Sequence, residues 1–118
     1  MGQVNLSDYK NIYLQTAKEY INKMSLSYSK LSKNSQDNEA INMLHISSHS
    51  LKSQSQVMGF TNITNLCADI EKVSNDILNK ISLVDGNFMN LLKNSVDKLN
   101  LEFNLIEKGD AETSLRGR

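Results

Sequence analysis

The feature that most constrains the fold of this chain is a helical periodicity whose long runs contain no helix-breaking proline. Proline is absent from all 118 residues, and apolar residues recur three or four positions apart over long stretches. A proline inside a helix removes a backbone hydrogen bond, whereas an apolar spacing of three or four residues marks one face of an amphipathic helix. The sequence therefore predicts an all-α protein.

Four segments carry this periodicity, each with one apolar stripe. The stripes lie within residues 6–31, 40–58, 63–81 and 88–106. The second stripe is unusual because Ser48 and Ser55 occupy two of its positions, where small side chains would let neighbouring helices come close. Polar or turn-forming residues separate the four segments, so each is predicted to be one helix.

Residues between the segments fit the ends of helices. Polar residues 32–37 offer several N-caps for the second helix, and Gly59 suits the C-terminus of that helix. Thr61 and Asp85 are the predicted N-caps of the third and fourth helices. Because short connections between long helices favour antiparallel neighbours, we expect an up-down-up-down four-helix bundle.

The length of the chain is that of one domain. A chain of 118 residues can bury a single core without disulfides or metals. Residues 1–108 are predicted to form the bundle. Residues 109–118 are polar and aperiodic, and we expect them to be a disordered tail or a linker stub.

Charge and composition argue against several classes of partner. Thirteen Lys and Arg residues balance thirteen Asp and Glu residues, so the electrostatic basis for nucleic-acid binding is missing. No stretch approaches the ~20 apolar residues that span a bilayer, and the N-terminus does not resemble a signal peptide. The single cysteine, Cys67, is predicted to be a buried thiol in a reducing compartment. We expect a cytoplasmic protein that binds neither nucleic acid nor membrane.

A strip of polar residues beside the second stripe is the candidate for chemistry. His45, His49, Lys52, Ser53 and Gln56 share this edge of the predicted helix. At the edge, the imidazole of His49 is partly supported and partly open, which favours a nucleophile. Lys52 lies one turn further and can place its ammonium beside a group carried by His49, while the small Ser53 would not block access.

A nucleophilic histidine needs one ring nitrogen held as a donor so that the other keeps its lone pair. Glu71 is the only charged residue on the matching edge of the third helix. His49 lies ten residues before Gly59 and Glu71 lies twelve after it. Antiparallel helices joined at Gly59 should therefore bring these two side chains together.

Other interpretations of the same residues stay open at this point. A lone surface histidine is more often idle than catalytic, so the chain could be a helical interaction or scaffold module. His45 and His49 also have the i, i+4 spacing of metal ligands, which would suit a metal- or haem-binding bundle. With one cysteine and no further histidine, we expect no complete metal site.

The combination of residues resembles a known family. "HSLKSQSQVMGF" at residues 49–60 is similar to the H-x-L-K-G-x-[SA]-x-x-x-G segment of histidine-containing phosphotransfer (HPt) domains. The likeness is nearest to the N-terminal phosphotransfer domains of CheA-type chemotaxis histidine kinases. "ITNLCADIEKVSNDI" resembles the third helix of that family, and the whole resemblance runs from about Leu6 to about Leu105.

The resemblance implies a role for each candidate residue. His49 would be the phosphoacceptor, Lys52 the cation near the phosphoryl group, and Glu71 the partner of the imidazole N–H. Ser53, Gln56 and Gly59 would belong to the surface on which a receiver docks.

Three positions depart from the family pattern. Ser53 replaces a glycine that often follows the lysine, and could crowd the docking surface. Ala68 stands where the chemotaxis kinases often carry a second histidine, so the hydrogen-bonded cluster would be smaller. His45 stands where an apolar residue is common, and we expect it to be idle or to pack rather than to accept a phosphoryl group.

The function implied by the resemblance is that of a carrier. The chain would take a phosphoryl group on His49 from the ATP-binding domain of a histidine kinase and pass it to an aspartate of a response-regulator receiver. Because the sequence has no Gly-rich nucleotide loop, we expect no intrinsic cofactor, with ATP and Mg²⁺ supplied by the partner domains. The chain would be free-standing or part of a histidine kinase, which leaves open whether it is an enzyme or only a substrate.

Overall fold

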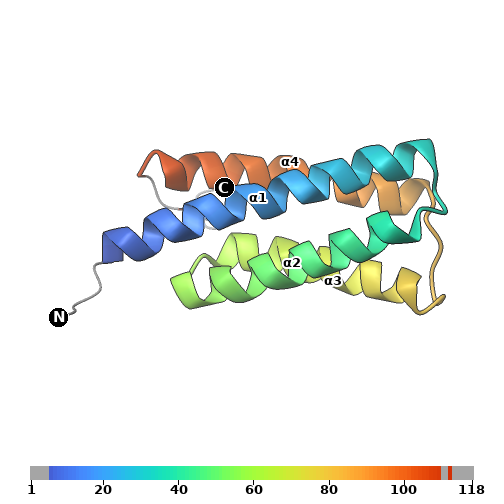
Figure 1. The fold of residues 1–118 in the computed structure, drawn as a ribbon, viewed down its shortest axis with the longest axis horizontal. Coiled ribbons are helices and arrows are strands. Elements are labelled where there is room, and N and C mark those ends of the chain that lie inside the picture. Colours follow the sequence, from blue (N-terminus) through green and yellow to red (C-terminus); the bar gives the residue numbers. More distant parts are fainter. Residues whose placement is uncertain (1–5, 110–111, 113–118) are drawn as a thin grey trace.

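The computed structural model describes residues 6–109 and 112, and within them the chain forms four helices. These are α1 (Leu6–Lys33), α2 (Asn38–Met58), α3 (Thr61–Leu78) and α4 (Gly86–Glu107). They run up, down, up and down along one long axis (Figure 1). Each helix packs against the next one along the chain, and α4 also packs against α1, which closes the bundle. The predicted antiparallel four-helix bundle is confirmed.

Three of the helix ends follow the predicted chemistry. The Asp37 side chain accepts a hydrogen bond from the Ala40 N–H at 3.0 Å, so it is the N-cap of α2. Asp85 caps α4 in the same way, accepting from the Phe88 N–H at 2.9 Å. Gly59 ends α2 with φ of 79°, the left-handed conformation for which glycine is preferred.

The predicted N-cap of the third helix is wrong. Thr61 is already the first residue of α3, and the position before it is Phe60, whose side chain makes no capping hydrogen bond. An N-cap residue lies just outside the helix, which Thr61 does not. The backbone N–H groups of Asn62 and Ile63 instead donate hydrogen bonds to the carboxylate of Glu112.

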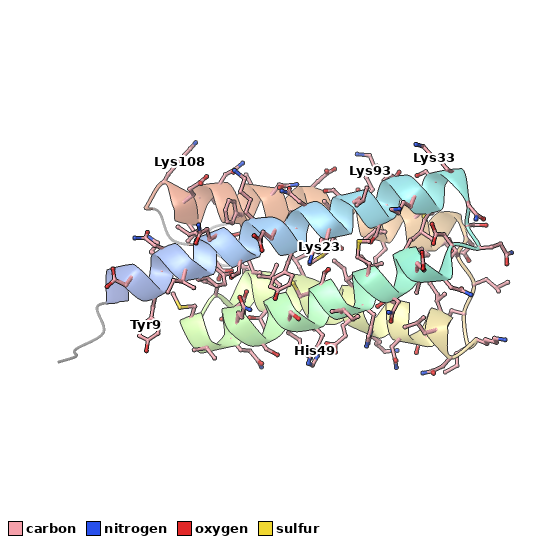
Figure 2. The ribbon with its side chains drawn as sticks, in the orientation of Figure 1. Tyr9, Lys23, Lys33, His49, Lys93 and Lys108 are labelled. Atoms are coloured by element: carbon pink, nitrogen blue, oxygen red, sulfur yellow. The ribbon has the colours of Figure 1, made fainter. Side chains whose placement is uncertain are left out.

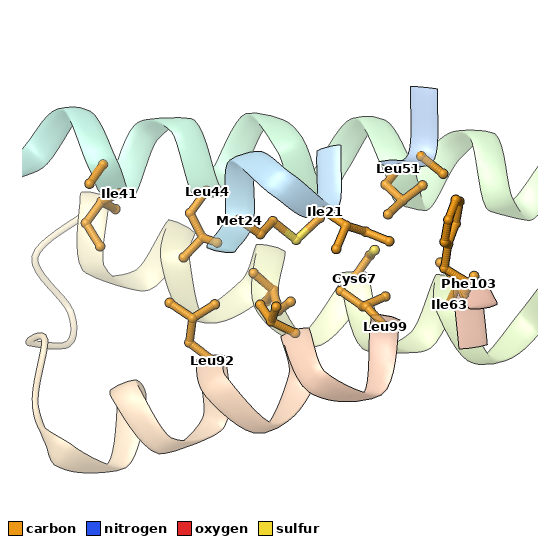
Figure 3. Close-up of a cluster of buried hydrophobic side chains, with 14 of the residues drawn as sticks. Ile21, Met24, Ile41, Leu44, Leu51, Ile63, Cys67, Leu92, Leu99 and Phe103 are labelled. Carbon is orange, nitrogen blue, oxygen red and sulfur yellow. The ribbon is translucent and has the colours of Figure 1, made fainter. Parts of the chain in front are cut away.

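Apolar side chains from all four helices fill the space between them (Figure 3). Those with no exposed surface are Ala17, Met24, Ala40, Leu44, Leu51, Ile63, Cys67, Ile70, Leu92, Leu99 and Ile106. Burial raises the pKa of the Cys67 thiol to about 12, so it stays protonated at neutral pH, as a buried thiol should.

Across the described residues, no helix is both long and apolar enough to cross a membrane.

Three predicted stripe residues are exposed and do not belong to the core: Tyr9, Ile81 and, at 36%, Leu91. Tyr9 is 50% exposed because the start of α1 extends beyond the end of α2, and its side chain points away from the bundle (Figures 1 and 2). Ile81 is 72% exposed because α3 ends at Leu78, before the periodic pattern does. Lys80 then takes φ of 62° and turns the chain towards α4.

The boundary between bundle and tail stays a prediction. Most of residues 109–118, which were expected to be disordered, lie outside the described part of the chain. Gly109 and Glu112 are described, and Glu112 contacts α3.

Candidate functional site

His49 lies on the outer side of the α2–α3 pair. Its side chain is 58% exposed and projects away from α1 and α4 (Figure 2). Nδ1 of its ring lies 2.6 Å from Oε2 of Glu71 on α3. The contact that counting outward from Gly59 predicts is therefore present.

Lys52 completes a group of three side chains, which we call the His49 cluster (His49, Lys52 and Glu71). Nζ of Lys52 lies 2.6 Å from Oε1 of Glu71, so each carboxylate oxygen has one partner. Exposure falls from His49 to Lys52 at 28% and Glu71 at 19%. The carboxylate is thus the inner member of the cluster and the imidazole the outer one.

The charge on Glu71 determines which atom of His49 is free. Burial opposes ionisation of this carboxyl group, but the hydrogen bonds from Lys52 and His49 and their charges outweigh it, so the pKa of Glu71 lies below its usual value. An ionised carboxylate can only accept, and the hydrogen shared with Nδ1 therefore belongs to the imidazole. In the neutral ring, Nε2 then carries the lone pair.

The turn after α2 sets the level at which α2 and α3 meet. The Gly59 N–H donates to the Gln56 carbonyl, and the Phe60 N–H donates to the Ser55 carbonyl. These bonds close the end of α2 and reverse the chain, so that residues equally far from Gly59 lie side by side. The tight reversal is what brings Glu71 to the level of His49.

The two serines in the α2 stripe are fully buried, and the hydroxyl of each makes a hydrogen bond. The Ser48 hydroxyl donates to the carbonyl of His45 at 3.1 Å, on the helix itself. The Ser55 hydroxyl lies 2.7 Å from the hydroxyl of Tyr13, so it joins α2 to α1. Burial, only partly offset by this hydrogen bond, raises the pKa of Tyr13 to about 12.

The predicted docking residues are at the surface of α2. Ser53 and Gln56 follow His49 by four and seven residues, and both are exposed, as is Gly59. The structure therefore leaves all three accessible on the helix that carries His49. Their role in docking stays a prediction.

Exposed apolar residues on α2 and on the neighbouring α1 were not predicted as part of the site. Ile46 is 53% exposed, Val57 is 87% exposed, and Ile12 of α1 is 59% exposed. The Thr16 hydroxyl donates to Oε1 of Gln54 at 2.8 Å and so joins α1 to α2. Ile12 lies one helical turn from Thr16, and Val57 lies about one turn from Gln54. We call Ile12, Ile46 and Val57 the apolar rim. The available signal was an apolar residue on the polar face of an amphipathic helix.

A shallow groove lies between α2 and α3 beside the His49 cluster. The residues that line it are His45, Lys52, Ala68, Glu71, Lys72 and Asn75. Nδ1 of His45 lies 3.4 Å from the hydroxyl of Ser74, so this half-buried ring contacts α3. Among the residues that the structure describes, no three His, Cys, Asp or Glu side chains are grouped so that they could hold a metal ion.

Comparisons with known proteins bear on what this arrangement does. Residues 8–101 match the family model described as the Hpt domain, a range that includes His49, Lys52 and Glu71. Among solved structures, the chain is similar to the CheA phosphotransferase domain from Thermotoga maritima, with a TM-score of 0.81 and 23% sequence identity. The match covers 88% of this chain and 99% of that one. At this identity the structural likeness supports the fold, whereas the family match concerns the sequence itself.

Proposed function

Since this chain belongs to the Hpt domain family, we propose that it is the histidine phosphotransfer module of a chemotaxis-type two-component relay. His49 accepts a phosphoryl group from the ATP-binding domain of a histidine kinase. It then passes that group to an aspartate of a response-regulator receiver. The buried thiol of Cys67 suits a reducing compartment, so we place the module in the cytoplasm.

The observation that best supports this proposal is the 2.6 Å contact between Nδ1 of His49 and the carboxylate of Glu71. It holds one nitrogen of an exposed imidazole as a donor and leaves the other nitrogen with a lone pair. A surface histidine without such a partner would populate both tautomers and several ring orientations. The arrangement therefore favours a histidine that reacts at Nε2.

The proposed reaction consists of two phosphoryl transfers. The Nε2 lone pair attacks the γ-phosphorus of ATP, the bond from that phosphorus to the β–γ bridging oxygen breaks, and ADP leaves. The phosphorylated ring keeps its proton on Nδ1, where Glu71 stabilises the positive charge. In the second transfer an aspartate oxygen of the receiver attacks the phosphorus, and the Nε2–P bond breaks. The transition states are loose, so positioning and charge dominate the catalysis.

Lys52 has two uses in this scheme. In the structure its ammonium bonds Glu71, which helps to keep that carboxylate ionised. A lysine ammonium has three donors on a flexible stem, and we propose that Lys52 also places positive charge beside the phosphoryl group. ATP and Mg²⁺ belong to the partner domains in this proposal.

The receiver is proposed to dock on the face of α2 that surrounds His49. Its aspartate must reach Nε2, so the interface has to include the exposed neighbours Ser53, Gln56 and Gly59. The apolar rim lies along the same helix and the adjoining edge of α1, and would supply the apolar contacts that interface cores need. Because the chain carries no net charge, we expect packing rather than long-range attraction to hold the receiver.

The test is phosphorylation in trans by the kinase core of a chemotaxis histidine kinase with ATP. We expect an acid-labile label on the wild-type chain and none on His49→Gln. His45→Gln is the matched control, because it removes a histidine one turn away on the same helix, and we expect it to keep the label. A label that persists in His49→Gln would contradict the assignment. No label on the wild-type chain would favour the alternative, a helical interaction module.

A further inference from the structure

Helix α3 begins without a cap of its own. Helices α2 and α4 each start after an aspartate whose side chain bonds a backbone N–H of the first turn. Phe60 occupies the equivalent position before α3 and has no oxygen to offer. The first N–H groups of a helix have no partner within the helix, so they need another acceptor.

Glu112, five residues after the last residue of α4, supplies that acceptor. Its Oε2 accepts from the Ile63 N–H at 2.8 Å, and its Oε1 accepts from the Asn62 N–H at 3.1 Å. Both oxygens of one carboxylate are used, on two successive N–H groups. The negative charge also lies at the positive end of the helix dipole, which adds to the attraction.

The surroundings of this contact belong to three helices. The ring of Phe60 lies 5.2 Å from the ring of Tyr13, centroid to centroid, and the Tyr13 hydroxyl bonds Ser55. Burial is the main cause of the raised pKa of Tyr13, and the charge of Glu112 adds to it. Glu112 therefore lies where α1, the end of α2 and the start of α3 come together.

We propose that the Glu112 carboxylate caps α3 in place of a side chain before the helix, and that Glu112 is thereby tied to the α2–α3 turn. The cap lies 49 and 50 residues away in sequence from the groups it binds. The contact of Glu112 and the stability of the first turn of α3 are thus coupled. Displacing Glu112 removes this acceptor from two backbone N–H groups at the start of the helix that carries Glu71.

The proposal is tested on the full chain by measuring amide signals and amide hydrogen exchange by NMR. In Glu112→Ala we expect the largest shift changes at the amides of Asn62 and Ile63. We also expect their exchange to accelerate by roughly two- to thirtyfold, the factor that corresponds to the usual contribution of an N-cap. Helix content should be unchanged, because the contact lies outside the core.

Glu107→Ala is the matched control, since it removes an exposed glutamate from the last turn of α4. It should leave the Asn62 and Ile63 amides as they are in the wild-type chain. The proposal is overturned if Glu112→Ala leaves them unchanged or if Glu107→Ala has the same effect. No phosphoryl transfer is measured, so the result is independent of the proposed function.

Discussion

The two nitrogens of the His49 ring have different surroundings, and this difference is the basis of the proposed chemistry. Nδ1 faces the Glu71 carboxylate, whose other oxygen is held by Lys52. Because the pKa of Glu71 is lowered in the folded chain, its ionised form stabilises the fold, and this contribution is complete above the ordinary carboxyl pKa. It is lost as the pH falls through the lowered pKa. At neutral pH the orienting carboxylate is therefore fully charged.

Replacing Glu71 should change the tautomer of His49 more than it changes the fold. In Glu71→Gln the side chain can offer either a carbonyl or an NH₂ group to Nδ1, so the preference for the proton on Nδ1 should weaken. Ring ¹⁵N chemical shifts in the neutral state would report the tautomer ratio. Glu39→Gln, an exposed glutamate near the start of α2, is the control and should leave the ratio unchanged. Equal ratios in wild type and Glu71→Gln would mean that the carboxylate does not orient the ring.

The residue contacts were predictable to different degrees. The pairing of His49 with Glu71 follows from their distances to Gly59 along the chain, because the turn fixes which levels of two antiparallel helices meet. The pairing of Lys52 with Glu71 does not follow. A lysine ammonium sits on a flexible four-carbon stem, so its helical position alone does not determine where the ammonium lies.

Helix ends show where local sequence determines structure and where distant residues do. Asp85 and Gly59 were predictable because each acts on its own turn of the chain. The start of α3 was not, because its cap, Glu112, comes from about fifty residues away. The left-handed Lys80 was not predictable either, because lysine has no preference for that conformation.

Two substitutions at left-handed positions should change stability in opposite directions. An added Cβ at Gly59 would meet no atom within 4 Å, so Gly59→Ala should cost only the backbone strain, about 1 kcal/mol. Lys80→Gly should remove similar strain, and the gain is reduced because glycine is freer in the unfolded chain, leaving roughly 0.5 kcal/mol. Chemical denaturation of both variants would measure the free energies of unfolding. Shifts of the free energy of unfolding in the same direction would show that left-handed backbone strain does not determine the stability of these turns.

The whole molecule presents its candidate chemistry on one side. His49 projects from the α2–α3 pair, whereas Lys33, Lys93 and Lys108 project along the opposite edge, beside α1 and α4 (Figure 2). The buried side chains between the two pairs hold α2 and α3 in register, and so hold Glu71 against His49. The packing of the core therefore determines which ring nitrogen of His49 faces outward.

At this scale the fold was predictable from the sequence, whereas the apolar rim was not predicted. Four uninterrupted apolar stripes with short connections leave few arrangements other than an antiparallel bundle. Ile46 and Val57 are as apolar as the core residues, and in the sequence only their position on the polar face of the second helix distinguishes them from the core. The roles assigned to the His49 cluster came from its resemblance to a family, which the match over residues 8–101 supports for the chain as a whole.

The position of the phosphoryl group on the imidazole tests the central claim most directly. The full chain, labelled with ¹⁵N in its histidines, would be phosphorylated by a histidine kinase core with ATP and analysed by NMR for coupling between phosphorus and ring nitrogen. We predict coupling to Nε2 of His49, and loss of that signal when a receiver domain and Mg²⁺ are added. Coupling to Nδ1 of His49, or to either nitrogen of His45, would contradict the account.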